Sequence, residues 1–456
     1  MNTVFIGCGA GFAGDRFDAA LPVIAHLSHC DGPRYLIYEV LGERTVALAL
    51  KEKLKNPEAG YSPYLDHYLK LSLEGIRKHN IKLVTNMGAA NPAAAASRIH
   101  ELSKKKKLSP FRIAIVEGDD LRSYLDDTVI TGSEIIEGNT VDGRELLSAN
   151  VYLGAVPIAE ALATDVDIVL VGRTTDSALV LGPLIHEFGW PLDNLDKMAA
   201  GTVAGHLLEC GGQVTGAYFA DPGFKDVPDM DRLGFPLAEI SSDGGIVITK
   251  ADNTGGCVTT ATVTEQLLYE MHDPSAYLVP EVTLDVTGVE LREESKNRIR
   301  VRGVRGHKPP QQLKATLCVD NGWMAEAEMS YAGMNALARA KLASEIVLGR
   351  MHRQGLDESI RTDIIGAYSV LDGGSDHIAS AKSLPFEGDY RLRLTLISPN
   401  RDQAQLLIDE LQSLYCSGPA AGGGFRGQVT EQIATASIMI DRQIVESNVR
   451  IREIPA

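Results

Sequence analysis

Short apolar runs rich in β-branched residues alternate with longer segments of helical periodicity from residue 1 to about residue 275. This alternation is typical of buried parallel strands that are joined by covering helices. We therefore predict an α/β domain with a mostly parallel sheet flanked by helices. The predicted strands are 3–7, 34–39, 81–85, 111–117 and 166–172, and the predicted helices are 45–55, 64–79, 92–104, 143–163 and 198–210.

After about residue 280 the pattern changes to alternating polar and apolar positions, as in residues 312–319 and 390–397. Two helical segments, near 334–351 and 401–415, interrupt it. Such alternation indicates half-buried strands of an antiparallel sheet. We therefore expect an α/β domain over residues 1–278 that carries the active site, followed by a smaller α+β domain over 279–456.

The first predicted strand continues into GCGAGFAGDR, which has the Gly9-x-Gly11-x-x-Gly14 spacing of a dinucleotide-binding turn. A turn of that kind places its third glycine in the first turn of a helix. Pro22 would break a helix that began at the second glycine, but it fits the first turn of a helix that begins near residue 19 or 20. The spacing alone therefore does not establish an NAD site.

The alternative interpretation of this stretch is a long glycine-rich loop over residues 7–18 that binds an anion. In that case Asp15 and Arg16 lie over the edge of the sheet. Glu39 at the end of the second strand meets the remaining requirement of a dinucleotide site, so an NAD-dependent oxidoreductase stays open as an alternative.

Polar residues follow four of the predicted strands. In open α/β sheets, ligands bind beyond the carboxyl ends of the strands, so these residues are candidates for a site. The same residue types also serve as turn and helix-cap residues, which explains any one of them equally well. Four strands that end in polar residues at one edge of the sheet favour a binding site there. The residues concerned are Glu39, Asn86, Asp119, Asp120, Arg173 and Asp176.

Asn91 and Pro92 have the residue types of a helix cap and a first helical position. The free N–H groups of a helix that starts there would favour an anion. Arg173 could bind a carboxylate or phosphate with two hydrogen bonds, although an arginine three residues before Asp176 is as often part of a local ion pair.

The run GHLLECGGQ places His206, Glu209 and Cys210 on one face of a helix that ends at the two following glycines. The carboxyl end of a helix disfavours a thiolate, so we interpret Cys210 as a packing residue rather than a nucleophile. The same field stabilises a charged His206, which together with Glu209 suits a general acid–base pair. A capping histidine in a buried ion pair is the structural alternative.

The chain of 456 residues, with 44% hydrophobic and 23% charged residues, is long enough for two or three globular domains. A net charge of −16 argues against nucleic acid and anionic membranes as partners, because both require a basic face. The six cysteines form no CxxC pair, which argues against zinc ribbons and disulfide scaffolds. Without a visible leader or a long uncharged apolar run, we expect a cytoplasmic protein.

Several long motifs, taken in order, resemble the acyclic terpene utilisation family AtuA. They extend from residue 5 to about residue 350, and a later GPAAGGG at 418–424 is also similar to the family. The motifs are GAGFAGDR, TNMGAANPAAAA, VEGDD, GRTTDSALVLGPLIHEFGW, GHLLECGGQVTGAYFADPG, TGGCVT and TEQLLYEMHDPSAYLVPEV.

The resemblance implies a cytoplasmic catabolic protein that works among enzymes of branched terpenoid or acyl-CoA degradation. It supplies neither a reaction nor catalytic residues. Many members carry a further small C-terminal domain with a Ser-Gly-Asp-Lys-Gly motif, which is missing before Ala456. We therefore expect either a separate small subunit or a member that works alone.

From the residues we predict acid–base chemistry, of the hydratase, lyase or hydrolase kind, on a small branched carboxylate or acyl-CoA. A non-catalytic partner of an acyl-CoA enzyme is a further alternative, and we expect a homo-oligomer. The sequence predicts no cofactor, and Mg²⁺ is compatible with its many carboxylates although no spacing requires it. The candidate catalytic residues are Asp15, Glu39, Asp119, Asp120, His206 and Glu209, and the candidate substrate-binding residues are Gly9, Gly11, Arg16, Asn86, Asn91, Arg173, Asp176, Gln213 and Lys250.

Overall fold

The computed structural model describes residues 3–141, 143–356, 360–367 and 388–455. Contacts divide the chain into two compact units. The larger consists of residues 1–142, 146–318 and 435–456, and the smaller of residues 143–145 and 319–434. This division differs from the expected domains 1–278 and 279–456, because residues 279–318 and the C-terminal segment fold with the larger unit.

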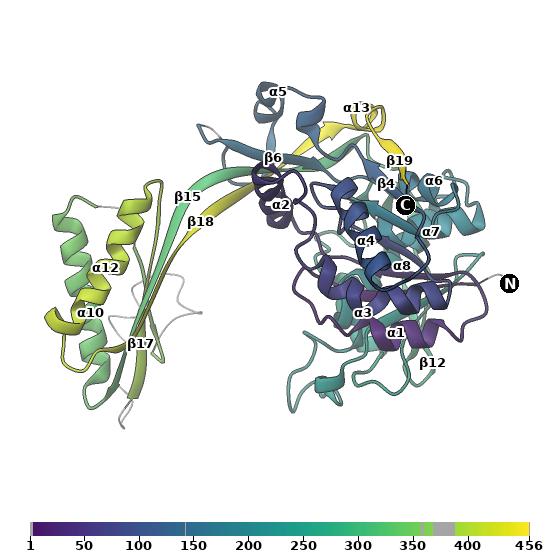
Figure 1. Ribbon diagram of the computed structural model, residues 1–456. Helices are drawn as coiled ribbons and strands as arrows, with labels where there is room; N and C mark the ends of the chain where they lie inside the picture. Colours follow the sequence, from purple (N-terminus) through teal and green to yellow (C-terminus); the bar gives the residue numbers. More distant parts are fainter. Residues whose placement is uncertain (1–2, 142, 357–359, 368–387, 456) are drawn as a thin grey trace. The chain divides into compact units, whose positions relative to one another are not determined.

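A sheet of ten strands forms the centre of the larger unit (Figure 1). Its strand order is β12-β13-β9-β8-β1-β2-β3-β7-β4-β19. The five strands from β1 to β4 in this order are parallel to one another, and they are β1 (Thr3–Ala10), β2 (Arg34–Tyr38), β3 (Lys82–Thr85), β7 (Ile168–Val171) and β4 (Ile113–Glu117). All five coincide closely with predicted strands.

The outer strands of this sheet are antiparallel, so the prediction of a mostly parallel sheet is wrong and the sheet is mixed. The β8–β9 hairpin pairs with β1 at one side, and the C-terminal strand β19 pairs with β4 at the other. These outer strands are β8 (Pro236–Ser241), β9 (Ile246–Lys250), β13 (Arg298–Arg302), β12 (Glu290–Ser295) and β19 (Arg450–Ile454).

Helices cover both faces of the sheet. On one face, α1 (Ala20–Leu27), α3 (Leu65–Lys78) and α4 (Pro92–Lys105) share a hydrophobic core with side chains of β2 and β3 such as Leu36 and Leu83. On the other face, Tyr35 of β2 donates a hydrogen bond to Glu187 of α7. That second group of helices consists of α6 (Val156–Leu162), α7 (Ala178–Phe188) and α8 (Leu195–Glu209).

The predicted helix over 143–163 is wrong. The segment contains strand β6 (Leu146–Val151) followed by the short helix α6, which has Pro157 in its first turn. Strand β6 pairs with β15, about 160 residues later in the chain, and this distant partner overrides the helical periodicity of the segment.

Smaller elements complete the larger unit. Strands β10 (Tyr277–Val279), β11 (Val282–Asp285) and β14 (Arg305–His307) form a separate antiparallel sheet. Strand β5 (Ile135–Gly138) pairs with β18. The remaining helices are α2 (Glu43–Lys55), α5 (Asp127–Thr131), α9 (Thr260–Leu268), α13 (Arg442–Glu446) and the short 3₁₀ helices 121–123, 211–215 and 230–232.

The smaller unit contains an antiparallel sheet with two helices packed on one face (Figure 1). The strand order across this sheet is β16-β17-β15-β18. The strands are β16 (Arg361–Ile365), β17 (Gly388–Ser398), and the long strands β15 (Gln312–Gly333) and β18 (Gly423–Asp441). Helices α10 (Ala336–Arg353) and α12 (Arg401–Ser417) bury Ala340, Val347, Leu407 and Leu411 against the sheet. The α+β character predicted for this part of the chain is therefore present.

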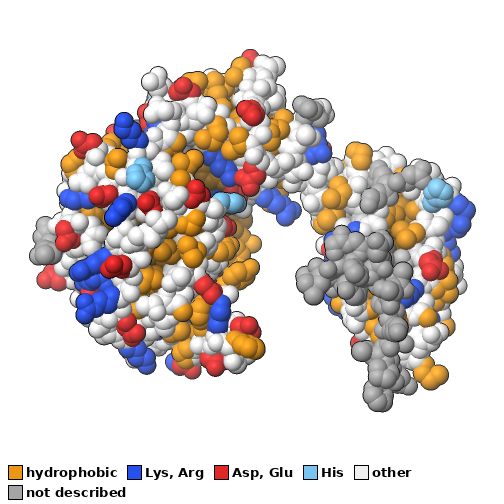
Figure 2. All heavy atoms as spheres, turned by 180° about the vertical axis from the view of Figure 1, so that it is seen from behind, with side chains coloured by type: hydrophobic (Ala, Val, Ile, Leu, Met, Phe, Trp, Pro, Cys, Tyr) orange, Lys and Arg blue, Asp and Glu red, His pale blue; other side chains and the backbone are white. Residues whose placement is uncertain are grey.

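No helix in the described residues is both long and apolar enough to pass through a bilayer. Figure 2 shows charged side chains of both signs interspersed with hydrophobic ones on the visible face of the larger unit.

Candidate functional site

A cleft of about 600 Å³ lies in the larger unit where the chain leaves the carboxyl ends of β1, β2 and β7. The ends of parallel strands share one edge of a sheet, so residues that are distant in sequence meet there. The carboxyl end of α8 and the loops that follow it complete the walls. The lining residues fall within 11–16, 39–43, 173–176, 209–218, 230–235 and 269–270.

The glycine-rich loop at the edge of the cleft is closed by Asp15. One Asp15 oxygen accepts a hydrogen bond from the Gly11 N–H at 2.9 Å, and the other accepts one from the Arg16 N–H at 2.7 Å. Burial raises the pKa of Asp15, although these two hydrogen bonds oppose the change. Two of the N–H groups that an anion-binding loop would offer are therefore already occupied by the chain's own carboxylate.

Two glycines of this segment, Gly9 and Gly11, let the backbone approach neighbouring groups closely. A Cβ atom on Gly9 would lie 2.5 Å from the Tyr38 ring, and one on Gly11 would lie 2.3 Å from the backbone of Cys210. Helix α1 begins only at Ala20, as predicted from Pro22, so the third glycine is outside the helix. The geometry of a dinucleotide-binding turn is absent from this described segment.

Glu39 is held at the end of β2 by neighbouring groups. Its Oε1 accepts hydrogen bonds from the Leu41 N–H at 3.0 Å and from the Asn86 amide at 2.8 Å. Asn86 is itself fixed, because its oxygen accepts from the Val40 N–H. Burial raises the pKa of Glu39, even though Arg173 lies near enough to lower it.

Arg173 and Asp176 follow β7. The Arg173 guanidinium donates to the Leu41 carbonyl, stacks 4.1 Å from the centre of the Tyr152 ring, and has a side chain only 5% exposed. It lies 3.5 Å from Asp176 and 3.7 Å from Glu43. Arg173 therefore balances the charge of buried carboxylates and is not a free anion contact.

Asp176 reaches the cleft with 32% of its side chain exposed, while its Oδ1 atom is buried. In the part of the chain that the structure describes, no group donates a hydrogen bond to this oxygen. Burial raises the pKa of Asp176 well above its ordinary value, and the charges of Glu39 and Glu209 add to the increase against the influence of Arg173. The same Oδ1 atom lies 3.5 Å from Arg173 Nη1, an ion pair without a hydrogen bond.

His206 and Glu209 meet at the carboxyl end of α8. The His206 Nδ1 atom lies 3.0 Å from Glu209 Oε1, and the two side chains are 2% and 10% exposed. Burial lowers the pKa of His206, but the charge and hydrogen bond of Glu209 raise it more, so the net direction is upward. Glu209 lines the cleft, whereas the buried His206 is outside the lining and contacts Glu209.

A profile of the family described as "Acyclic terpene utilisation family protein AtuA" matches residues 4–451 of the 456-residue chain. The chain belongs to this family. The match confirms the resemblance seen in the sequence motifs, and it spans every loop that lines the cleft. Searches of curated proteins and of solved structures found no significant match.

Three predicted catalytic residues of this AtuA-family chain lie outside the cleft lining: His206, described above, and Asp119 and Asp120. Asp119 is buried at the end of β4, and its Oδ2 accepts hydrogen bonds from the Arg173 N–H at 2.8 Å and the Asn150 amide at 2.9 Å. Asp120 caps the 3₁₀ helix 121–123 by accepting from the Arg122 N–H. Both carboxylates thus stabilise the loops around the site instead of lining it.

Four predicted binding residues also lie outside the cleft lining: Asn86, which is bonded to Glu39 as described above, and Asn91, Lys250 and Gly9. Asn91 caps α4, as predicted, and its amide donates to the carbonyls of Pro57 and Ala59, which cover that helix start. Lys250 is buried and donates to the Thr254 carbonyl and hydroxyl. Gly9 packs under the Tyr38 ring, as described above. By contrast, Gln213 does line the cleft.

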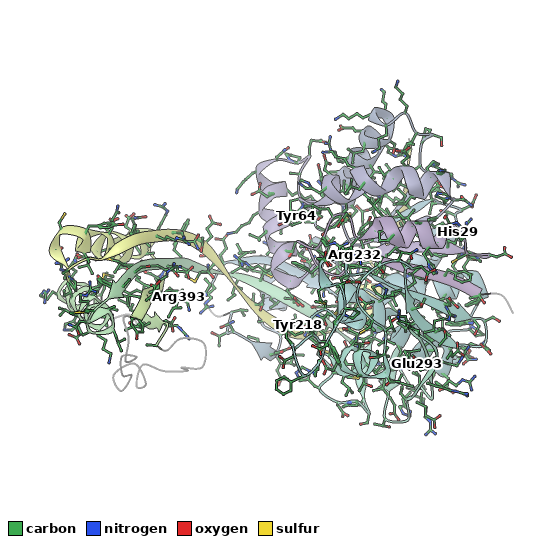
Figure 3. The ribbon with its side chains drawn as sticks, turned by 90° about the horizontal axis from the view of Figure 1, so that it is seen from below. His29, Tyr64, Tyr218, Arg232, Glu293 and Arg393 are labelled. Atoms are coloured by element: carbon green, nitrogen blue, oxygen red, sulfur yellow. The ribbon has the colours of Figure 1, made fainter. Side chains whose placement is uncertain are left out.

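The sequence reasoning missed several lining residues. Glu43 begins α2 directly after the second strand, so the rule of polar strand ends could have found it. Tyr269 and Glu270 lie in the TEQLLYEMHDP motif, where only the resemblance gave a signal. Tyr218, labelled in Figure 3, is 86% exposed and lies in the GHLLECGGQVTGAYFADPG motif, so again only the resemblance gave a signal.

The described residues contain no group of three or more His, Cys, Asp or Glu side chains arranged to hold a metal ion. Mg²⁺ therefore stays a prediction from composition alone.

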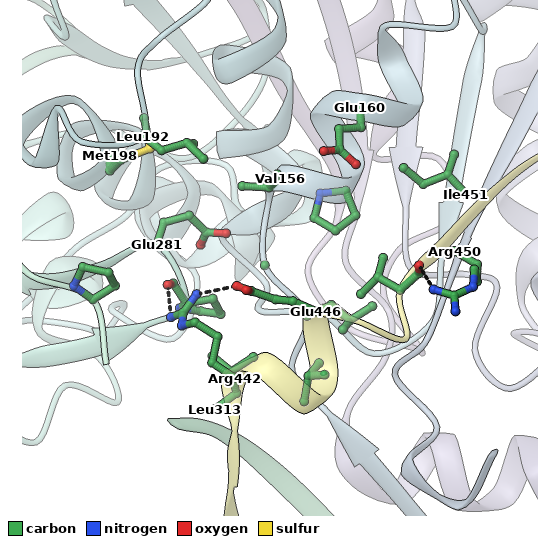
Figure 4. A pocket seen from close by; sticks show the side chains of 17 residues that line it. Val156, Glu160, Leu192, Met198, Glu281, Leu313, Arg442, Glu446, Arg450 and Ile451 are labelled. Carbon is green, nitrogen blue, oxygen red and sulfur yellow. Dashed lines mark hydrogen bonds and ion pairs between the residues drawn. The ribbon is translucent and has the colours of Figure 1, made fainter. Parts of the chain in front are cut away.

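A second cavity of about 580 Å³ lies between α6, the C-terminal segment and the loop before β11 (Figure 4). Its lining is mainly apolar. Arg442 donates to Glu446 and to the carbonyls of Pro280 and Pro310, and Glu281 accepts from the Ala155 N–H. Because these charged groups are committed to the protein itself, we take the carboxylate-lined cleft as the candidate site.

Proposed function

We propose that this AtuA-family protein is an enzyme that transfers protons to and from a small, partly apolar molecule during acyclic terpene utilisation. Its chemistry is of the hydratase, lyase or hydrolase kind. The observation that carries the proposal is Asp176, a cleft carboxyl whose buried Oδ1 has no hydrogen-bond donor among the described residues. Perturbed carboxyl groups in a cleft are typical of general acids and bases.

The neighbours of Asp176 support complementary roles for two carboxyl groups. Asp176, whose pKa is raised by burial and by nearby carboxylates, acts as the proton donor. Glu209, hydrogen-bonded to His206, acts as the proton acceptor. In a hydration, Asp176 protonates one carbon of a double bond while Glu209 removes a proton from the water whose oxygen bonds to the other carbon. Glu209 then releases this proton to solvent and Asp176 takes one from solvent, which restores both groups.

Family membership supports the metabolic setting, and the cleft supports the chemistry. The glycine turn gives no support to an NAD-dependent reaction, because Asp15 occupies its N–H groups. A non-catalytic role in an enzyme complex would not explain why Asp176 and Glu209 both line the cleft.

The test is solvent-deuterium incorporation. Purified protein is incubated in D₂O with unsaturated acyclic monoterpene alcohols, acids and CoA thioesters, and the products are followed by NMR and mass spectrometry. Asp176→Asn and Glu209→Gln each lower the incorporation rate by about 100-fold or more, as expected when a general acid or base is lost. Asp31→Asn and Glu58→Gln, at exposed positions outside the cleft, leave the rate unchanged. Full activity in both cleft variants would overturn the proposal.

A further inference from the structure

The ionisable groups of the cleft are unbalanced toward negative charge. Six carboxyl groups line it against two guanidinium groups. The carboxyl groups belong to Asp15, Glu39, Glu43, Asp176, Glu209 and Glu270, and the guanidinium groups to Arg16 and Arg173.

Both arginines are already engaged by groups of the protein, although the buried Nε atom of Arg173 has no hydrogen-bond partner among the described residues. Arg173 is buried, donates to the Leu41 carbonyl and lies beside two of the carboxylates. Arg16 donates to Asp18 at 2.8 Å and to the Leu233 carbonyl at 3.0 Å. A ligand carboxylate would therefore add a negative charge among carboxylates without gaining an uncommitted cation in the cleft lining.

The same carboxyl groups suit an uncharged oxygen. An ionised carboxylate accepts a hydrogen bond from a hydroxyl group. Burial raises the pKa of Asp15, Glu39 and Asp176, so these groups take up a proton more readily than ordinary carboxyl groups do. A protonated carboxyl group donates a hydrogen bond to a carbonyl or hydroxyl oxygen, which a carboxylate cannot do.

Apolar and aromatic side chains make up much of the remaining lining, together with Gln213, Cys210 and three glycines. Most of the apolar and aromatic side chains come from one stretch of chain, residues 217–235, and from the loop after β1. The cleft thus offers an apolar surface for a hydrocarbon chain beside a group of hydrogen-bonding carboxyls. The apolar lining residues are Phe12, Leu41, Ala217, Met230, Leu233 and Phe235.

We infer that the cleft takes a neutral ligand: a hydrocarbon chain that ends in an uncharged hydroxyl, ester or thioester group, and not a free carboxylate. Terpene chains contain no nitrogen, so a neutral oxygen function suits the family better than an amine, which an acidic cleft would also attract. The inference rests on the proposed function for its setting, but it concerns binding and not turnover.

The experiment is isothermal titration calorimetry of the full chain with four ligands of one carbon skeleton. They are an acyclic monoterpene alcohol, the methyl ester of the corresponding acid, the free acid and the corresponding primary amine. We expect the alcohol and the ester to bind on the order of 10- to 100-fold more tightly than the acid. Tighter binding of the acid, or of the amine, than of both neutral ligands would overturn the inference.

Variants identify the source of the preference. Glu39→Gln removes an ionisable carboxyl group inside the cleft and Glu270→Gln removes one at its exposed rim, so each narrows the difference in affinity between ester and acid. Glu58→Gln leaves the difference unchanged, and thermal unfolding checks that each variant is folded. A difference that Glu39→Gln and Glu270→Gln both leave intact would contradict the electrostatic cause. Because binding is measured without turnover, loss of the proposed reaction and loss of this preference are separate results.

Discussion

Asp119 gives the sharpest test of which candidate carboxyl groups take part in the reaction and which only support the site. Its carboxyl group looks catalytic in the sequence, yet the structure places it behind the site, where one oxygen, Oδ2, accepts both of its hydrogen bonds. An asparagine has the same shape and retains one amide oxygen for these two donors. The substitution Asp119→Asn therefore removes the charge while it keeps the contacts.

The magnitude follows from the pKa. Burial raises the pKa of Asp119 from 3.8 to about 6, against the effect of its hydrogen bonds. The folded state therefore binds the proton more tightly than the unfolded state. The resulting stabilisation is fully present below about pH 4 and is lost as the pH rises through about 6. One pKa unit corresponds to about 1.4 kcal/mol, so ionised Asp119 lowers the free energy of unfolding by about 3 kcal/mol above pH 7.

We expect Asp119→Asn to match the wild type near pH 4 and to be more stable by up to about 3 kcal/mol above pH 7. Asp119→Ala leaves two buried donors without an acceptor and lowers stability by about 2–6 kcal/mol. Urea unfolding in a Trp323→Phe background measures both effects, because Trp190 then reports on the larger unit alone. Asp31→Asn, at an exposed position, is the matched control.

The activity of the same variant decides the role of Asp119. If Asp119 only positions the β7 end, Asp119→Asn keeps the proposed activity within a few-fold. A folded Asp119→Asn protein whose activity falls as far as that of Asp176→Asn would refute the assignment, as would a stability difference that does not change with pH.

Two further predictions concern the supports of the cleft. His206→Ala lowers kcat roughly tenfold with little change in KM and alters the pH–rate profile, because Glu209 loses its imidazole partner. Unchanged kinetics in a folded variant would show that His206 has a structural role only. Gly11→Ala lowers stability by about 1–3 kcal/mol, because the added Cβ meets the Cys210 backbone at 2.3 Å, whereas at Gly14 the nearest atom lies 3.2 Å away on the Phe12 ring. Thermal unfolding compares the two, and equal losses at both glycines would contradict the packing argument.

The sequence predicted the parallel strands well because each is a short, buried, β-branched run between longer helical segments. It missed the β8–β9 hairpin, and with it the mixed sheet, since that hairpin is defined by its pairing with β1 more than 200 residues earlier. It also misplaced the division of the chain, because β19 returns to pair with β4 over 300 residues away. Local periodicity contains no information about partners at such separations.

The site could be predicted as far as polar strand ends define it. Glu39, Arg173 and Asp176 meet in one cleft, as the rule for parallel sheets requires. The rule could not separate Asp119 from Asp176, because both follow strands of the same sheet and only the side-chain hydrogen bonds tell them apart. Nor could the rule show that the Asp15 carboxylate accepts hydrogen bonds from N–H groups of the glycine-rich loop.

The central claim, that protonated Asp176 is the proton donor of an acid–base enzyme, is tested most directly by the pH dependence of kcat/KM. Burial and the neighbouring carboxylates raise the pKa of Asp176, so the wild-type rate falls on the alkaline side of its profile as Asp176 loses its proton, at a pH above the ordinary range of an aspartate. The account predicts that the residual activity of Asp176→Asn lacks this fall, while Asp31→Asn retains it. A fall that persists unchanged in Asp176→Asn would contradict the account.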